Sequence, residues 1–232
     1  MSEQIGPAEV THPAIRRTGL SSETRRRFWR LGYHVVGLFP LAWLLFDFWF
    51  GLLGPEPIRA MILRTGKAAI VMLTLTLACT PAGFILGWKQ AAVARRPLGL
   101  YTFMYVCLHL AIFVGLDYGF MMRLVIEEII LRRYAVVGFI AFLLLIPLAI
   151  TSTKGAQRRM GKRWKTLHKL VYLIAALAVV HYIWLVKNAY AQPLLFAGMI
   201  GGLLVLRLAP IKQYFLDIRR RLDRRRNSVE PR

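Results

Sequence analysis

Apolar residues in this chain fall into long blocks that short polar segments separate. The six blocks cover residues 31–53, 67–87, 98–120, 134–151, 167–186 and 193–209. A mostly apolar block of about 18 or more residues is long enough to cross the hydrocarbon core of a bilayer as one helix. The pattern therefore predicts an all-α fold, an integral membrane bundle of six transmembrane helices.

The polar ends of the chain divide it into three regions. Residues 1–30 are predicted as a basic N-terminal tail, 31–210 as the transmembrane domain and 211–232 as a basic C-terminal tail. The first 30 residues lack the short apolar core and small-residue cleavage site of a signal peptide. We therefore expect the first span to remain as an anchor.

The formal net charge of +21 invites comparison with nucleic-acid-binding proteins. With both tails placed inside, 23 of the basic residues outside the spans lie on the inner side and 7 on the outer side. Such an asymmetry follows the positive-inside rule, and it also favours anionic lipid headgroups at the inner surface. The charge therefore predicts cytoplasmic termini and contact with membrane lipids, and no nucleic-acid partner.

The segment 121–133, MMRLVIEEIILRR, is amphipathic and is expected to lie along the outer surface between the third and fourth spans. Its Glu127 and Glu128 either meet a partner or form a solvated face, and the solvated face is favoured. Asp47 and Asp117 lie near the outer ends of the first and third spans. They either hold a proton path, a quinone or a partner, or are interfacial acids without such a role.

Four histidines lie inside predicted spans, where ionisable groups are costly and usually functional. His34 is near the inner face, and His109 is near the middle of the third span. His168 is at the inner end of the fifth span, and His181 lies in its outer half. Because 13 residues of helix extend about 20 Å, His168 and His181 cannot bind one metal centre. His109 and His181, however, lie at similar depths on different spans.

Two neutral imidazoles that face each other across a bundle can hold a haem iron from both sides. The stretches YVCLHLAIF and VVHYIWLV offer apolar walls for the macrocycle. Zinc would need a tighter set of ligands. Cys79 and Cys107 lie outside any CxxCH motif, which excludes covalent haem attachment and leaves them as packing residues. The alternative is that each histidine only hydrogen-bonds between helices.

The stretch TSTKGAQRRMGKRWKTLHKLVYLIAALAVVHYIW resembles the haem signature of the ferric-reductase-like transmembrane family. The matching positions are its TST, Gly161, Trp164, Leu167-His168, Tyr172 and His181. HVVGLFPLAWL, TGKAAIVMLTLTLACTP, RRPLGLYTFMYVCLHL and QPLLFAG resemble one branch of that family. This branch consists of the haem-binding membrane subunits of periplasmic protein-methionine-sulfoxide reductase systems. The resemblance covers residues 31–210.

The resemblance implies an electron-transfer subunit of the bacterial inner membrane, without substrate chemistry of its own. It implies one or two b-type haems and an FMN, with His109, His168 and His181 as ligands of haem iron. Electrons would come from the quinone pool or a cytosolic flavin reductase. They would pass to a periplasmic molybdopterin subunit, MsrP, in a heterodimer that repairs oxidised methionines of periplasmic proteins.

The chain departs from two-haem members of the wider family at one place. Those relatives have a second histidine about fourteen residues before the first in the third span, where this chain has Arg95 and Arg96. His34 lies at the depth needed to replace it as the partner of His168. Arg95, Arg96, Lys162 and Arg163 either pair with haem propionates or a flavin phosphate, or only fix topology, which is favoured.

Two other functions remain open from the sequence. One is a ferric or other metal reductase, a cytochrome b with a different acceptor, although no FAD or NADPH domain follows the spans. The other is a cofactor-free transporter or scaffold, which predicts a colourless purified protein. Histidine substitutions would have no spectral effect in that case.

Overall fold

The computed structural model describes residues 22–229, and no strand occurs among them. The helices are α1 (Ser22–Trp49), α2 (Pro57–Ile85), α3 (Lys89–Ile112), the π-helical turn η1 (Phe113–Asp117), α4 (Met122–Leu131), α5 (Arg133–Ile150), α6 (Lys154–Met160), α7 (Lys162–Leu167), α8 (Leu170–Leu185), α9 (Ala191–Val205) and α10 (Ala209–Val229). The predicted all-α membrane bundle is confirmed. Of the predicted N-terminal tail, residues 1–21 lie outside the described range.

Five helical segments are long and apolar enough to cross a membrane, and they correspond to the first five predicted spans. They are Arg27–Trp49, Pro57–Ile85, Gln90–Asp117, Arg133–Ile150 and Lys162–Leu185. The sixth predicted span is bent: α9 has only 15 residues and extends about 22 Å, and it is long enough to cross only when the start of α10 is counted with it. It meets α10 at an angle of 71°. The chain becomes strongly basic beyond this bend, so the apolar stretch ends before a straight sixth helix is complete.

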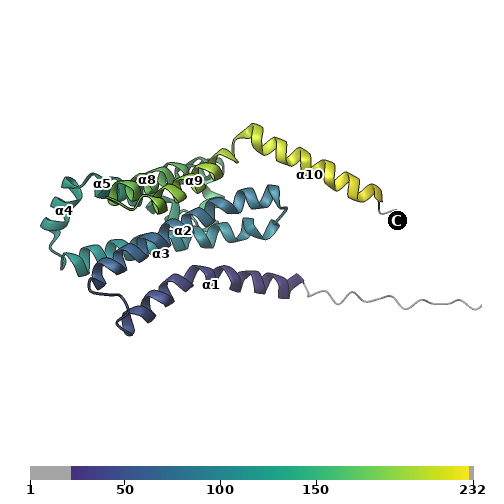
Figure 1. Cartoon of the computed structure of the whole chain (residues 1–232). Coiled ribbons are helices and arrows are strands. Elements are labelled where there is room, and N and C mark those ends of the chain that lie inside the picture. Colours follow the sequence, from purple (N-terminus) through teal and green to yellow (C-terminus); the bar gives the residue numbers. More distant parts are fainter. Residues whose placement is uncertain (1–21, 230–232) are drawn as a thin grey trace, which may run out of the picture.

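The long helices run side by side in the bundle (Figure 1). The helix α4 lies at one end, while the start of α1 and the whole of α10 lie at the other (Figure 1). Both ends of the described chain therefore emerge at the same end of the bundle. Large apolar side chains such as Trp43, Phe46 and Leu143 are exposed, as a lipid-facing surface requires.

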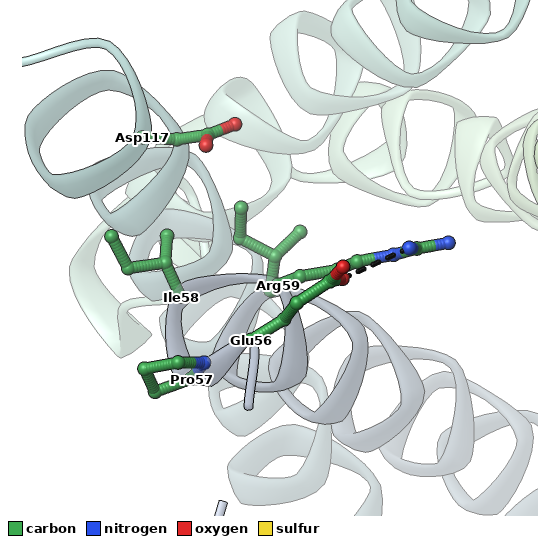
Figure 2. Close-up of a pocket in the computed structure, with 6 residues that line it drawn as sticks. Glu56, Pro57, Ile58, Arg59 and Asp117 are labelled. Carbon is green, nitrogen blue, oxygen red and sulfur yellow. Dashed lines mark hydrogen bonds and ion pairs between the residues drawn. The ribbon is translucent and has the colours of Figure 1, made fainter. Parts of the chain in front are cut away.

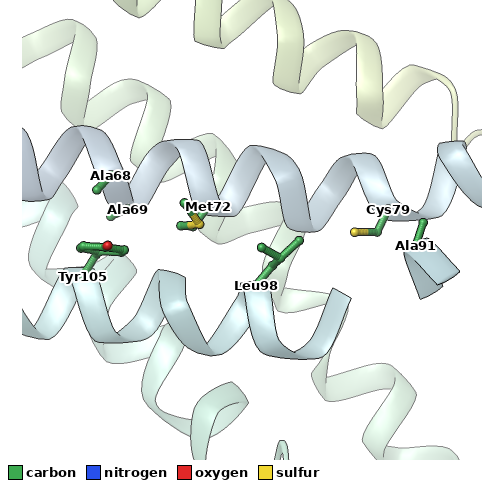
Figure 3. Packing of buried hydrophobic residues seen from close by; sticks show 7 residues of the cluster. All are labelled: Ala68, Ala69, Met72, Cys79, Ala91, Leu98 and Tyr105. Carbon is green, nitrogen blue, oxygen red and sulfur yellow. The ribbon is translucent and has the colours of Figure 1, made fainter. Parts of the chain in front are cut away.

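The centre of the bundle is α2, which packs most extensively on α3 and also contacts α1, α9 and α10. Ala68 and Ala69 lie opposite Tyr105, and Met72 extends toward α3 (Figure 3). Small residues at such an interface let two membrane helices approach closely. The buried hydroxyls of Thr74 and Thr76 donate to carbonyls four residues earlier, at 2.8 and 2.7 Å, so they leave no unpaired donor in the core.

A second helix pair, α5 and α8, lies beside the first. Leu145, Leu148 and Ile174 are buried together at its interface. The two pairs meet where α3 contacts α5 and where α9 bridges α2 and α8. Phe103 of α3 stacks on Phe142 of α5, with ring centroids 6.4 Å apart. The bundle is therefore two close helix pairs with a smaller interface between them.

The first helix is held against α3 at its internal proline, Pro40. The hydroxyl of Tyr105 accepts a hydrogen bond from the Leu41 amide at 3.0 Å and donates one to the Gly37 carbonyl at 2.7 Å. In an unbroken helix that amide would bond that carbonyl directly. A side chain from α3 thus inserts into the hydrogen-bond ladder of α1 and fixes where α1 docks.

The surface helix α4 keeps its charged residues paired within its own sequence. Arg123 pairs with Glu127 and Arg132 with Glu128, each at 2.9 Å between residues four apart. Val125 on the opposite side is buried. Both glutamates therefore have a basic partner four residues away, and of the two only Glu127 is exposed.

Candidate functional site

His109 and His181 lie side by side at the interface between the two helix pairs. His109 comes from α3 and His181 from α8. Their ring centroids are 6.5 Å apart, and the ring planes meet at 87°. The structure thus brings together the two histidines whose matching depths the sequence predicts.

Each of these rings is held by a backbone carbonyl of the neighbouring helix. Nδ1 of His109 donates to the carbonyl of Ile62 at 2.9 Å, and Nδ1 of His181 donates to the carbonyl of Tyr134 at 2.7 Å. A carbonyl can only accept, so the proton of each neutral ring is on Nδ1 and the lone pair is on Nε2. Neither Nε2 hydrogen-bonds to any described residue. This is the state in which histidine binds a metal.

The distance between the rings would let both imidazoles bind one metal ion. Two imidazoles whose Nε2 atoms both lie about 2 Å from the same metal have their centroids roughly 6 Å apart. The observed 6.5 Å is close to that value. Among residues 22–229 no group of three or more His, Cys, Asp or Glu side chains is placed to hold a metal ion. A pair of histidines suits haem, whose macrocycle supplies the remaining ligands.

His168 lies in a separate network at the junction of α7 and α8. Its ring stacks on Trp164, with centroids 4.0 Å apart. The Thr151 hydroxyl donates to the Pro147 carbonyl at 2.6 Å, so its oxygen is the acceptor for Nε2 of His168 at 3.1 Å. The proton of His168 is therefore on Nε2, the opposite assignment to that of His109 and His181.

His34 is hydrogen-bonded to a tyrosine of the neighbouring helix. Its Nδ1 is 2.8 Å from the hydroxyl of Tyr101 on α3. The helix that carries it, α1, packs on α2 and α3, whereas α8, which begins two residues after His168, packs on α5 and α9. The structure thus gives His34 and His168 separate hydrogen-bond partners, Tyr101 and Thr151.

The predicted basic candidates at the inner end are all exposed. They are Arg95, Arg96, Lys162 and Arg163. Arg207, which sequence reasoning did not single out, is instead engaged between α9 and α10. It donates to the Tyr172 hydroxyl at 3.0 Å and to the Leu77 carbonyl.

The acids at the outer end have distinct surroundings. Asp47 is buried and forms an ion pair with Arg64 of α2, which gives it a structural partner. Asp117 is exposed and lines an open cavity of about 420 Å³ together with Glu56, Arg59 and Ile62 (Figure 2). Burial, followed by the Glu128 and Asp117 carboxylates, raises the pKa of Tyr118 beside it. Ile62 also supplies the carbonyl that holds His109, so this cavity adjoins the histidine pair.

Sequence reasoning missed two glycines, Gly66 and Gly138, that lie against the rings of His109 and His181. It noted Thr151, whose hydroxyl bonds His168, only as part of a longer motif. Thr151 belongs to the TST of the family signature. The glycines carry no chemistry that would have drawn attention to them. The role of these glycines is seen only in their contacts with the histidine rings of the facing helices.

Comparison with known proteins gives consistent matches. Residues 65–179 match the family model described as ferric reductase like transmembrane component. The protein-methionine-sulfoxide reductase heme-binding subunit MsrQ of Rhodospirillum rubrum is 45% identical over 187 residues, which cover 80% of this chain and 90% of the relative. The proteins of the same name from Xanthomonas campestris pv. campestris and Xanthomonas axonopodis pv. citri are each 43% identical over 177 residues, covering 74% of this chain and 81% of each relative.

No solved structure matches the chain. The family match runs from within α2 to within α8; it includes His109 and His168 and ends two residues before His181. With 45% identity over 90% of a full-length relative, the likeness extends well beyond a shared motif. The chain therefore belongs to the MsrQ family of ferric-reductase-like transmembrane proteins.

Proposed function

We propose that this protein is an electron-transfer subunit that holds a b-type haem between His109 and His181. The observation that carries the proposal is the pair of rings 6.5 Å apart, each with Nδ1 bonded to a carbonyl and Nε2 left for iron. The names of its relatives, which describe heme-binding subunits, support it. When bound, haem supplies one-electron chemistry, and the protein supplies position and environment.

The residues around the pair favour a neutral, water-poor site. The carbonyls of Ile62 and Tyr134 keep both rings in one tautomer and one orientation. Such hydrogen bonds also raise the basicity of the ligating nitrogen. Ile112 is buried three residues after His109, and Ala178 packs into the core three residues before His181. Apolar surroundings of this kind tune a haem potential by excluding water.

The wider pathway is proposed from the family. Electrons would enter from the quinone pool or a cytosolic flavin reductase and leave to a periplasmic molybdopterin partner, MsrP, which repairs oxidised periplasmic proteins. The relatives are named as subunits, which supports a protein partner. The basic residues concentrated on one side support placement in the inner membrane with both termini cytoplasmic.

A second haem and FMN remain predictions. His168 and His34 are the candidate ligands for a second haem, and each would have to exchange a present partner, Thr151 or Tyr101, for iron. For the FMN we propose no site.

The test is a reduced-minus-oxidised absorption spectrum of the detergent-purified chain, expressed with ample haem. We expect a b-type spectrum in the wild type and its loss in His109→Ala and His181→Ala. Trp184→Leu is the matched control, because Trp184 lies on α8 close to His181 but is 53% exposed. A colourless wild-type protein would exclude the haem and favour a transporter or scaffold.

A further inference from the structure

Each histidine of the pair rests on a glycine of the facing helix. A Cβ at Gly66 would lie 3.2 Å from both Cε1 and Nδ1 of His109. A Cβ at Gly138 would lie 2.6 Å from Nδ1 and 2.8 Å from Cε1 of His181. The second contact is too short for any real side chain, so alanine at position 138 would force the ring to move.

The glycine stands in both cases four residues after the accepting carbonyl. Gly66 follows Ile62, and Gly138 follows Tyr134. In a helix, a carbonyl points toward the residue four positions later, whose side chain lies over the same groove. With hydrogen in place of that side chain, the second lone pair of the carbonyl becomes accessible to an imidazole from the next helix.

The same arrangement occurs twice with identical spacing. In both pairs the histidine lies 47 residues after its accepting carbonyl. All three positions of the first pair recur 72 residues later in the second: 62 and 134, 66 and 138, 109 and 181. The accepting helix comes first and the histidine helix second in each case, α2 with α3 and α5 with α8. The two halves of the site thus share one arrangement of carbonyl, glycine and histidine.

We infer that Gly66 and Gly138 are positioning residues that set the direction of the two axial imidazoles. Each glycine lets its ring dock on a carbonyl, and the two docked rings stand at 87° to each other with Nε2 free. The part of this inference that treats the imidazoles as iron ligands rests on the proposed function. Perpendicular imidazole planes give ferric haem a strongly anisotropic low-spin electron paramagnetic resonance (EPR) signal, which reports ring orientation directly.

The first experiment compares Gly66→Ala and Gly138→Ala with Gly99→Ala and Gly201→Ala as controls. A Cβ at Gly99 would meet only Thr76 Cγ2 at 3.7 Å, and one at Gly201 would meet nothing within 4 Å. Alanine raises helix propensity at all four positions, so the helices themselves are not weakened.

We expect G138A to lower the haem-to-protein ratio about tenfold, because one iron ligand is displaced. We expect G66A, with its milder contact, to keep more haem but shift the largest EPR g value toward that of parallel planes. Both controls should match the wild type. A wild-type EPR signal and haem ratio in G138A and G66A would overturn the inference.

The second experiment is a double-mutant cycle on the haem-free chain, which separates positioning from general packing. The apparent melting temperature in detergent is measured for wild type, G138A, H181A and the double variant, and likewise for G66A with H109A. If a glycine acts through its histidine, alanine lowers the melting temperature only when the ring is present. Equal effects in both backgrounds would assign the glycine to helix packing and overturn the inference.

The outcomes remain distinguishable if the proposed function fails. A wild-type chain that binds no haem would overturn the proposed function, yet the cycle would still show whether the glycines orient the rings. If G138A does not accumulate, the milder G66A and H109A cycle decides the question.

Discussion

His181 lies in α8 and His168 just before it, but the rings of the histidine pair and of His168 form hydrogen bonds through different nitrogens. His109 and His181 donate from Nδ1 to carbonyls and keep Nε2 unbonded, whereas His168 donates from Nε2 to Thr151. The pair is separated by 6.5 Å, while His168 stacks on Trp164. A histidine inside a membrane span is therefore not informative by itself. The nitrogen that its hydrogen bond leaves free indicates what the ring can bind.

The sharpest test of this difference removes one ring of the pair. We expect H109A and H181A each to lower haem content at least tenfold, because the remaining imidazole is a single axial ligand. Pyridine haemochrome content per mole of protein measures this. Equal haem content in H109A and wild type would mean that the His109–His181 pair is no more a haem site than His168 is.

The next test removes the ring of the other region. We expect H168A to lower haem content no more than twofold, since the 109–181 pair is untouched in this variant. The same measurement applies, with H34A beside it as the predicted partner. A loss as deep as that of H181A would show that His168 serves the same iron or is required to form its site.

A smaller effect should follow from releasing His168 from its hydroxyl acceptor. Thr151→Val keeps the shape of the side chain but leaves the donor of His168 unpaired. A partly buried unpaired donor costs about 1–3 kcal/mol, so we expect a lower apparent melting temperature without loss of the haem at the pair. Thr166→Val, an exposed site on α7, is the control. Loss of the haem spectrum in T151V would contradict the separation of the two regions.

The smallest effect is expected at His34. Tyr101→Phe removes an exposed hydrogen bond between side chains, worth about 1 kcal/mol or less. Tyr105→Phe is the informative comparison, since that hydroxyl satisfies two backbone groups of α1 and its loss should cost more. Thermal unfolding in detergent measures both. A larger loss in Y101F than in Y105F would mean that His34 has a role its hydrogen bond does not explain.

Much of the fold could be predicted because bilayer thickness constrains it directly. Five of the six predicted apolar blocks are single helices long and apolar enough to cross a membrane, since about 20 apolar residues have few alternatives there, and the sixth meets the same test only together with the start of α10. Helix ends were less predictable: α1 begins at Ser22, well before the apolar block at residue 31. The short α9 and its 71° bend were also missed, because mean apolarity does not show where a helix breaks.

The sequence predicted the depth of each candidate histidine in the membrane, but not its contacts. Counting residues from the membrane faces placed His109 and His181 at one level, and the structure places them side by side. Depth could not show that His168 hydrogen-bonds to Thr151 or that His34 hydrogen-bonds to Tyr101, since both contacts depend on how the helices are rotated about their axes. The 72-residue recurrence of a glycine and a histidine was present in the sequence and is the signal that could have identified Gly66 and Gly138.

The small interface between the two helix pairs has a consequence for how long the protein survives in the cell. Each pair has a close internal interface, but the contacts that join one pair to the other are fewer. If haem is held as proposed, by one ligand from each pair, it binds only when both pairs are adjacent, and by mass action its concentration would stabilise the joined form. Chains made while haem is scarce would then be degraded sooner, and the cellular abundance of the protein would follow haem supply.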